Sequence, residues 1–210
     1  MTRLPARPPR SSRRASWREA AFIALDFETT GLDPARDDVI SFGLVPIDDG
    51  RIDLSAARYR EVAPRVEPRH SSIRVHHLRT QDLASAPPMA EVVDGFRDAL
   101  AARVILAWAA GVEVAFLRRI FGGREWRWRS RTIDVRTLVM ALERGAGGET
   151  PKEPGHYALE AAARRYGVPV EQTHHALDDA FMTAELFLVA ASTFASRGAG
   201  TVGQLAKVSV

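Results

Sequence analysis

The stretch FIALDFETTGL, from Phe22 to Leu32, is an apolar run that carries two acids one residue apart. Its first seven residues have the length and apolar content of a buried strand. Because side chains alternate between the two faces of a strand, Asp26 and Glu28 are expected side by side on one face. Like charges at that distance repel each other, and partial burial raises the cost of each. A bound cation is one group that can offset this cost, which makes other acids in the chain candidates for the same site.

The composition limits the chemistry that such a site can use. Of the 210 residues, 46% are hydrophobic and 26% are charged, as in ordinary soluble domains. There is no cysteine, so disulfides, thiolate ligands and cysteine nucleophiles are excluded, and any metal is held by Asp, Glu or His. The sequence shows neither the roughly 20-residue apolar run of a membrane span nor the apolar segment of a signal peptide. We therefore expect a cytoplasmic protein with no membrane partner.

Positive charge is concentrated at the N-terminus. The first 18 residues hold six arginines and no acid, whereas the whole chain has a formal charge of +3, so the remainder is slightly acidic. Arg, Pro and Ser without apolar periodicity predict a disordered tail over residues 1–18. It is either a phosphate-binding arm or a solvated extension. One domain over residues 19–195 and a C-terminal tail over 196–210 are expected to follow.

Turn signals and hydrophobic periodicity predict an α/β fold. Strands are expected at Phe22–Glu28, Val39–Ile47 and near Arg58–Ala63, joined as two antiparallel hairpins. Beyond them, strand and helix patterns alternate. A strand is expected over 103–109, and helices over 89–102, 112–121, 157–167 and 176–198, with a strand end followed by a helix over 132–145. This order predicts a mixed central sheet, with three antiparallel strands at its start and helices packed on it.

Glu113 is the first further acid that the pattern points inward. It lies in the first turn of the helix expected from residue 112, on the same face as Phe116, Leu117 and Ile120. This position predicts a carboxylate directed toward the core side of the helix. The alternative is an acid favoured only by the positive end of the helix dipole.

The segment THHALDDAFMTAEL supplies two more acids at the start of the last long helix. Asp178 and Asp179 lie on different sides of its buried stripe, so periodicity does not choose between them. Helix capping and surface charge are the alternative explanation for this His and Asp pattern.

Together these motifs resemble the DEDDh 3′–5′ exonucleases, the group of the proofreading epsilon subunit of bacterial DNA polymerase III. The family's first motif matches DFETTG, from Asp26 to Gly31, and its third matches HHALDDA, with His174 as its histidine and Asp179 as its aspartate. The resemblance covers roughly residues 17–191. It implies a ribonuclease H-like fold.

The second motif departs from the family pattern. Where the family usually has His-Asn-Ala-x-Phe-Asp, this chain has WAAGVE, from Trp108 to Glu113. A carboxylate is kept at the metal-binding position, one methylene longer, but the His-Asn pair is lost. The resemblance therefore implies weakened substrate contacts with the reaction type retained.

The resemblance also assigns roles to individual residues. It implies two Mg²⁺ or Mn²⁺ ions held by Asp26, Glu28, Glu113 and Asp179, with His174 as the general base that completes the catalytic set. The expected substrate contacts are Phe27, Thr29, Thr30, Gly31, His76 in the segment VHHL, and Trp108. For Trp108, a place in the core is the alternative to stacking on a base.

The implied activity is metal-dependent removal of 5′-mononucleotides from single-stranded or frayed 3′ ends of nucleic acid, with DNA favoured. Association with a DNA polymerase is a further implication. Two alternatives remain: an exoribonuclease, and a nucleic-acid-binding module of the same fold with weak or no catalysis. The complete set of four carboxylates and one histidine favours an enzyme, because a binding module has no need of it.

Overall fold

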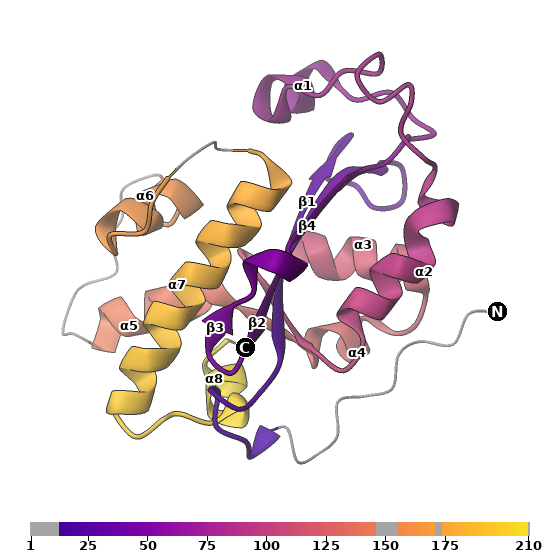
Figure 1. The fold of residues 1–210 in the computed structure, drawn as a ribbon. Helices are drawn as coiled ribbons and strands as arrows, with labels where there is room; N and C mark the ends of the chain where they lie inside the picture. The colour runs from indigo at the N-terminus through magenta and orange to yellow at the C-terminus, as the bar shows by residue number, and fades with distance from the viewer. Residues whose placement is uncertain (1–12, 146–154, 171–173, 210) are drawn as a thin grey trace.

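The computed structural model describes residues 13–145, 155–170 and 174–209, apart from the side chains of residues 125 and 126 (Figure 1). The strands are β1 (Phe22–Thr29), β2 (Val39–Asp48), β3 (Arg51–Ile52), β4 (Arg58–Glu61), β5 (Val104–Ala107) and β6 (Thr132–Asp134). The helices are α1 (His70–His76), α2 (Met89–Leu100), α3 (Gly111–Phe121), α4 (Glu125–Arg129), α5 (Val135–Gly145), α6 (Leu159–Arg165), α7 (Ala176–Ser196) and α8 (Val202–Val208), with one 3-10 turn, η2 (Leu54–Ala56).

The predicted mixed sheet is confirmed, and β1 lies at its centre. Within the described residues the sheet has six strands in the order β3-β2-β1-β5-β6, with β4 also paired to β2. The pairs β1–β2 and β2–β4 are antiparallel, whereas β1–β5 and β5–β6 are parallel. The turn signal after β2 has positive φ angles at Asp49 (51°) and Gly50 (69°), as a tight hairpin requires. This turn leads into the short β3, and η2 follows before β4, an insertion that the sequence did not predict.

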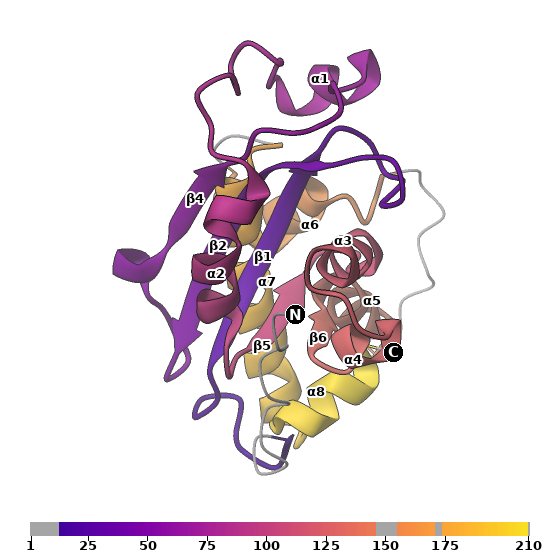
Figure 2. The same cartoon turned by 90° about the vertical axis from the view of Figure 1, so that its right-hand side faces the viewer.

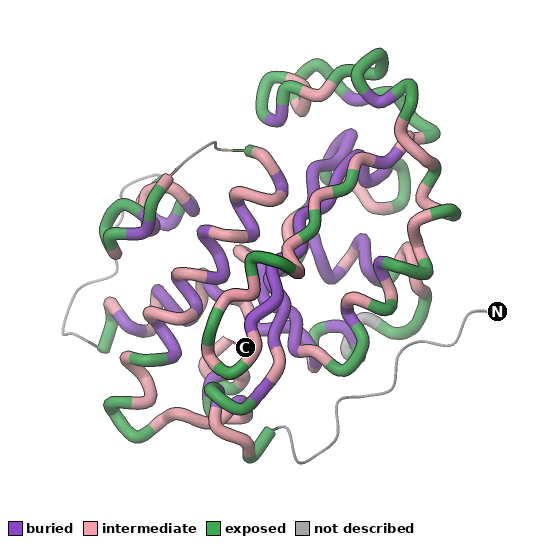
Figure 3. Tube along the Cα trace, in the orientation of Figure 1, coloured by how far each residue is buried: buried purple, intermediate pink, exposed green. Residues whose placement is uncertain are grey.

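Helices cover both faces of the sheet (Figures 1 and 2). On one face, α5, α6, α7 and α8 contribute to a core that includes alternate β1 residues such as Phe22 and Ala24. On the other face, α2, α3 and the buried Trp128 of α4 pack against Ile23 and Leu25. The buried residues follow the strands and the inner sides of the helices (Figure 3). Among the described residues, none of the helices has the length and hydropathy of a membrane-spanning segment.

The described parts of the two expected tails pack on the domain. Residues 1–12 lie outside the described part of the chain, but Trp17 is buried and its backbone N–H donates to the carbonyl of Gly200 at 3.0 Å. The expected C-terminal tail contains α8, which begins with a capping box of Thr201 and Gln204. Leu205 of α8 is fully buried in the core. Residues 13–18 and 199–209 are therefore part of the folded unit.

This packing predicts a large effect of one substitution outside the expected domain. Leu205→Ala should lower the free energy of unfolding by about 2–5 kcal/mol, because it removes a buried side chain and leaves a cavity. Urea denaturation of the wild type, Leu205→Ala and the matched α8 variant Lys207→Ala measures the difference. Equal midpoints for all three proteins would show that α8 does not contribute to the fold.

Candidate active site

Strand β1 places Asp26 and Glu28 on one face of the sheet. The strand is covered on both sides, so Glu28 is only 8% exposed. Phe27 lies between the two acids but faces the opposite core, where its ring contacts those of Phe96 and Phe116 at centroid distances of 5.8 and 6.3 Å. The alternation predicted from the sequence is confirmed, and the structure does not bring Phe27 to the carboxylates.

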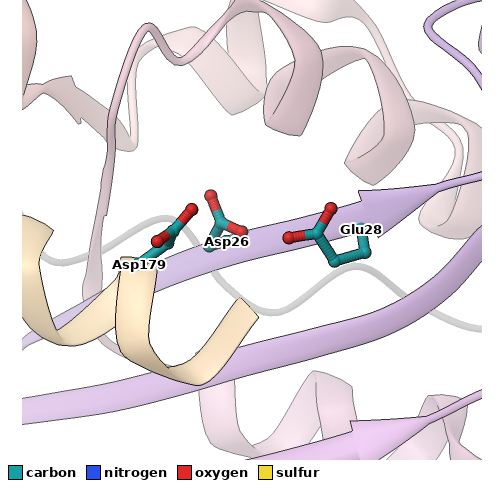
Figure 4. Close-up of side chains that lie close together, drawn as sticks. All are labelled: Asp26, Glu28 and Asp179. Carbon is teal, nitrogen blue, oxygen red and sulfur yellow. The ribbon is translucent and has the colours of Figure 1, made fainter. Parts of the chain in front are cut away.

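Helix α7 adds Asp179 to this face. Ligand oxygens of Asp26, Glu28 and Asp179 all lie within 4.8 Å of one another (Figure 4). Asp178 instead contacts Nδ1 of His175 at 3.1 Å, so the structure makes the choice that periodicity left open. These three acids are called the carboxylate cluster below.

A glycine in β2 permits this approach of α7. A Cβ atom at Gly43 would overlap the backbone of Ala176 in the first turn of α7. Gly43 is paired with Asp26 across the β1–β2 ladder, so the helix crosses the sheet beside that acid. A glycine inside a buried strand is a signal for close backbone approach, and it was available in the sequence.

Glu113, in the first turn of α3, lies next to the carboxylate cluster but is not one of its three members. It is 5% exposed, and its charge raises the pKa values of both Asp26 and Glu28. Behind it is Asp134, whose carboxylate accepts hydrogen bonds from the backbone N–H groups of Ala110 and Thr137, both at 3.1 Å. Asp134 thereby ties the loop before α3 to the start of α5.

Burial is the largest cause of the unusual acidities here. It raises the pKa of Glu28 to about 8, with help from the charges of Asp179 and Glu113. It also raises the pKa of Glu113 to about 8 and that of Asp179 to about 7. For Asp26, burial and then the charges of Glu113, Glu28 and Asp179 raise the pKa well above its ordinary value. Without a cation, these groups therefore resist ionisation near neutral pH.

The donor atoms fit a divalent cation. Oδ1 of Asp179 and Oε2 of Glu113 are buried and have no hydrogen-bond partner among the described residues. Unpaired buried oxygens are costly, and a cation satisfies them directly. Ligands that are all oxygen match Mg²⁺ or Mn²⁺. The cluster can therefore hold a divalent metal ion.

The raised pKa values predict how stability depends on pH. Between about pH 4.5 and 8, the folded state holds protons on Glu28 and Glu113 that the unfolded state has lost, so the metal-free protein loses stability as the pH rises. We expect the melting temperature in EDTA to fall by at least 2–4 °C over this range, which corresponds to roughly 1 kcal/mol. Mn²⁺ should raise it most at pH 8, where the carboxylates ionise to bind metal. A melting temperature in EDTA that rises from pH 5 to 8 would contradict the assignment.

His174 lies two residues before the first residue of α7 and lines the same cavity as Asp26 and Asp179. Its backbone has a positive φ of 59°, and its side chain is 46% exposed. Nε2 of His174 is 3.7 Å from Oε1 of Glu160 in α6. Glu160 was not singled out from the sequence, because its contact depends on how α6 packs beside α7.

His76, predicted as a substrate contact, is buried near this histidine. Burial lowers the pKa of His76, and the neighbouring His77 and His174 lower it further. Its Nδ1 accepts a hydrogen bond from the backbone N–H of Leu78 at 3.0 Å. In the neutral ring, Nε2 then carries the hydrogen.

The residues after Glu28 form a braced turn. The Thr30 hydroxyl accepts from the backbone N–H of Asp38 at 2.9 Å, and the Ser72 hydroxyl donates to the Thr30 carbonyl at 2.8 Å. A Cβ atom at Gly31 would press on the buried carboxylate of Asp37, which Arg69 holds in place, so a larger residue there would force Asp37 to shift. Thr29 and Thr30 are both buried, and these contacts fix the turn at the Glu28 end of the cluster.

A cavity of about 730 Å³ opens at the other end of the cluster. Asp26, Asp179 and His174 line it together with Trp108. The indole N–H of Trp108 donates to the carbonyl of Tyr157 at 3.3 Å, while part of the ring packs on the core. Trp108 is therefore both a core residue and a residue of the cavity wall. The sequence had left these two positions open as alternatives.

Sequence comparison identifies the class of protein to which this fold and this acidic site belong. The sequence profile of the exonuclease family RNase_T matches residues 23–187, which include the carboxylate cluster, Glu113 and His174. The chain therefore belongs to the exonuclease family, and its relatives place it among the enzymes like the epsilon subunit of DNA polymerase III.

Two relatives illustrate the similarity. A DNA polymerase III of PolC type from Thermotoga petrophila is 31% identical over 179 residues, which cover 83% of this chain but 12% of that protein. A DNA polymerase III epsilon subunit from Treponema pallidum is 28% identical over 175 residues, covering 80% of this chain and 74% of that subunit. The chain thus spans only a small part of the PolC-type relatives.

Solved structures share the fold. Escherichia coli exonuclease I in complex with a dT13 oligonucleotide has a TM-score of 0.73 at 16% identity, over 85% of this chain and 42% of that one. Exonuclease X in complex with 5′-overhanging duplex DNA has a TM-score of 0.63 at 20% identity, over 90% of this chain and 99% of that one. The ribonuclease H-like exonuclease fold expected from the sequence is confirmed.

Proposed function

We propose that this chain is a metal-dependent 3′–5′ exonuclease of the DEDDh type that releases 5′-mononucleotides from single-stranded or frayed 3′ ends, with DNA favoured. The observation that carries the proposal is the carboxylate cluster with His174 beside it, at the mouth of a cavity within the size range of ligand sites. The DNA bound in the exonuclease I and exonuclease X complexes supports DNA as the substrate. The epsilon and PolC-type relatives support association with a DNA polymerase.

The catalytic roles follow from the positions of the side chains. Asp26, Glu28, Asp179 and the adjacent Glu113 would hold two divalent cations. Such cations, when bound, stabilise the charge on the attacking and leaving oxygens of a phosphodiester. Once ionised, these carboxylates repel a phosphate that no cation neutralises, so activity should depend on the cations.

His174 is the proposed general base. Its half-exposed imidazole can take a proton from the attacking water, and Glu160, whose Oε1 lies 3.7 Å from Nε2, can orient the ring. The turn of Thr29, Thr30 and Gly31, with the Nε2–H of His76 nearby, is the proposed seat of the terminal nucleotide. Its bracing keeps that seat rigid.

Digestion of labelled strands tests direction and substrate. With Mg²⁺ or Mn²⁺, a 3′-label on single-stranded DNA should be released at once as a mononucleotide, while a 5′-labelled strand shortens to a ladder. EDTA should stop both. RNA strands of the same sequence decide between deoxyribonuclease and ribonuclease. Internal cuts, or release of a 5′-label first, would contradict the proposal.

A nucleic-acid-binding module without catalysis is the second candidate. One observation favours it: Glu113 lies outside the group of three acids and stands where the family usually has a shorter aspartate. On this reading the protein binds single-stranded DNA in a gel-shift assay but does not cleave it with either metal ion. Any turnover that depends on Asp26 excludes this reading.

A further inference from the structure

Arg136, in the first turn of α5, contributes to the same cavity as Asp26 and Asp179. The neighbouring Asp134 accepts the hydrogen bonds of Ala110 and Thr137 that join the start of α5 to the loop before α3, so the backbone that carries Arg136 is held in place. The side chain is partly buried, and its Nε atom is fully covered. Arg136 therefore contributes a positive charge at the edge of the candidate active site.

The guanidinium of Arg136 has unused hydrogen-bonding capacity. Its buried Nε has no hydrogen-bond partner among the described residues, an arrangement that ordinarily costs free energy. The two cavity-lining histidines differ from it, because His156 contacts Glu143 at 3.2 Å and His174 contacts Glu160 at 3.7 Å. The terminal nitrogens of a planar guanidinium are suited to a phosphate, which they bind through two parallel hydrogen bonds.

Other residues of the cavity wall suit a nucleotide. Trp108 and Tyr157 bring aromatic rings to it, and Met140 lies one helical turn after Arg136. Aromatic faces in such a place stack on bases of any sequence. The volume of about 730 Å³ is in the range of sites that bury a small ligand. A cation and aromatic side chains thus line one wall beside the carboxylate cluster.

The order of residues along β1 indicates how a bound nucleic-acid strand would run relative to the cavity. The cavity includes Asp26 but not Glu28, whereas the turn of Thr29–Gly31 continues from Glu28 at the other end of the cluster. If the terminal nucleotide sits at that turn, as in the proposed function on which this step rests, the strand crosses the cluster and enters the cavity. The nucleotide in the cavity is then the second from the 3′ end.

We propose that this cavity binds the second nucleotide from the 3′ end, and that Arg136 binds the phosphate immediately 5′ of the scissile one. The preferred substrate is therefore a strand with at least two consecutive phosphates at its 3′ end. A dinucleotide without a 5′-phosphate has the scissile bond but lacks the phosphate that Arg136 would bind.

A matched pair of dinucleotides isolates this contact. We compare kcat/KM for thymidylyl-thymidine with and without a 5′-phosphate, because the two share one scissile bond and differ only in the phosphate that Arg136 would bind. A charge-assisted hydrogen bond of this kind predicts about a tenfold to hundredfold preference of the wild type for the phosphorylated dinucleotide. Arg136→Ala should reduce that ratio to about one, and Arg136→Lys should keep part of it.

The control variant is Arg51→Ala, which removes the same charge from the exposed strand β3. It should keep the wild-type ratio, and the melting temperature and Mn²⁺ response of Arg136→Ala should match the wild type. Equal rates on both dinucleotides in the wild type, or a ratio unchanged in Arg136→Ala, would overturn the inference and leave the exonuclease proposal intact. Cleavage of neither dinucleotide, together with no cleavage of longer strands, would instead overturn the proposed function and this inference with it.

Discussion

Asp26→Asn is expected to lower the rate of phosphodiester cleavage at least about a thousandfold, close to 4 kcal/mol of transition-state stabilisation. Burial and the charges of Glu113, Glu28 and Asp179 all raise the pKa of Asp26, so its carboxylate interacts with each of the other three acids. Asparagine keeps the shape of the side chain but removes the negative charge that attracts a cation. Single-turnover cleavage of single-stranded DNA with Mg²⁺ measures the loss.

The same substitution should not unfold the protein. It relieves repulsion among buried carboxylates, so the melting temperature in EDTA should equal or exceed that of the wild type. The matched control is Asp98→Asn, an exposed acid on α2. If Asp26→Asn cleaved as fast as Asp98→Asn with a normal melting curve, Asp26 would have no role in the reaction.

Glu113→Gln is expected to lower the cleavage rate by at least about a hundredfold, close to 3 kcal/mol. The side chain is buried, its Oε2 has no partner among the described residues, and its charge reaches both Asp26 and Glu28. Glutamine keeps its size but cannot supply the charge that offsets a second cation. Titration of Mg²⁺ and Mn²⁺, followed by cleavage rate and by thermal shift, measures the effect on catalysis and the effect on metal binding.

Glu113→Asp keeps the negative charge and tests whether the length of the side chain matters. It restores the family's usual residue but shortens the side chain by one methylene, about 1.5 Å. The backbone of α3 lies at a distance that suits the longer glutamate side chain, so the aspartate variant should bind metal less tightly. It should also work better with Mn²⁺ than with Mg²⁺, because the coordination geometry of Mg²⁺ is stricter. Identical metal responses in the wild type and both variants would remove Glu113 from the site and leave it as a helix N-terminal charge.

The sequence predicted those parts of the site that depend on local periodicity. Asp26 and Glu28 share a face because the strand period of two is set by the backbone, and the inward position of Glu113 follows from one helical turn. Asp179 could not be separated from Asp178 in this way, since both lie off the apolar stripe expected from the sequence, whereas the structure buries Asp179 and leaves Asp178 partly exposed. The choice is made by the crossing of α7 over Gly43 and by the contact of Asp178 with His175.

The parts that the sequence did not reveal depend on tertiary packing or on short elements. The seven-residue helices α1 and α8 are too short for a clear periodicity, although the Thr201–Gln204 capping box was a readable signal for α8. Glu160 and Arg136 gain their meaning only from the cavity that α5, α6 and α7 enclose with β1. No local pattern distinguishes either residue from an ordinary surface charge.

The central claim is that Asp26, Glu28 and Asp179 form a divalent-cation site. Calorimetric titration of Mn²⁺ into the chain at pH 8, where these acids can ionise, tests it most directly. The account predicts saturable binding of at least one ion per chain, present in Asp98→Asn and lost in Asp26→Asn. Absence of saturable binding, or binding equally strong in Asp26→Asn, would contradict it.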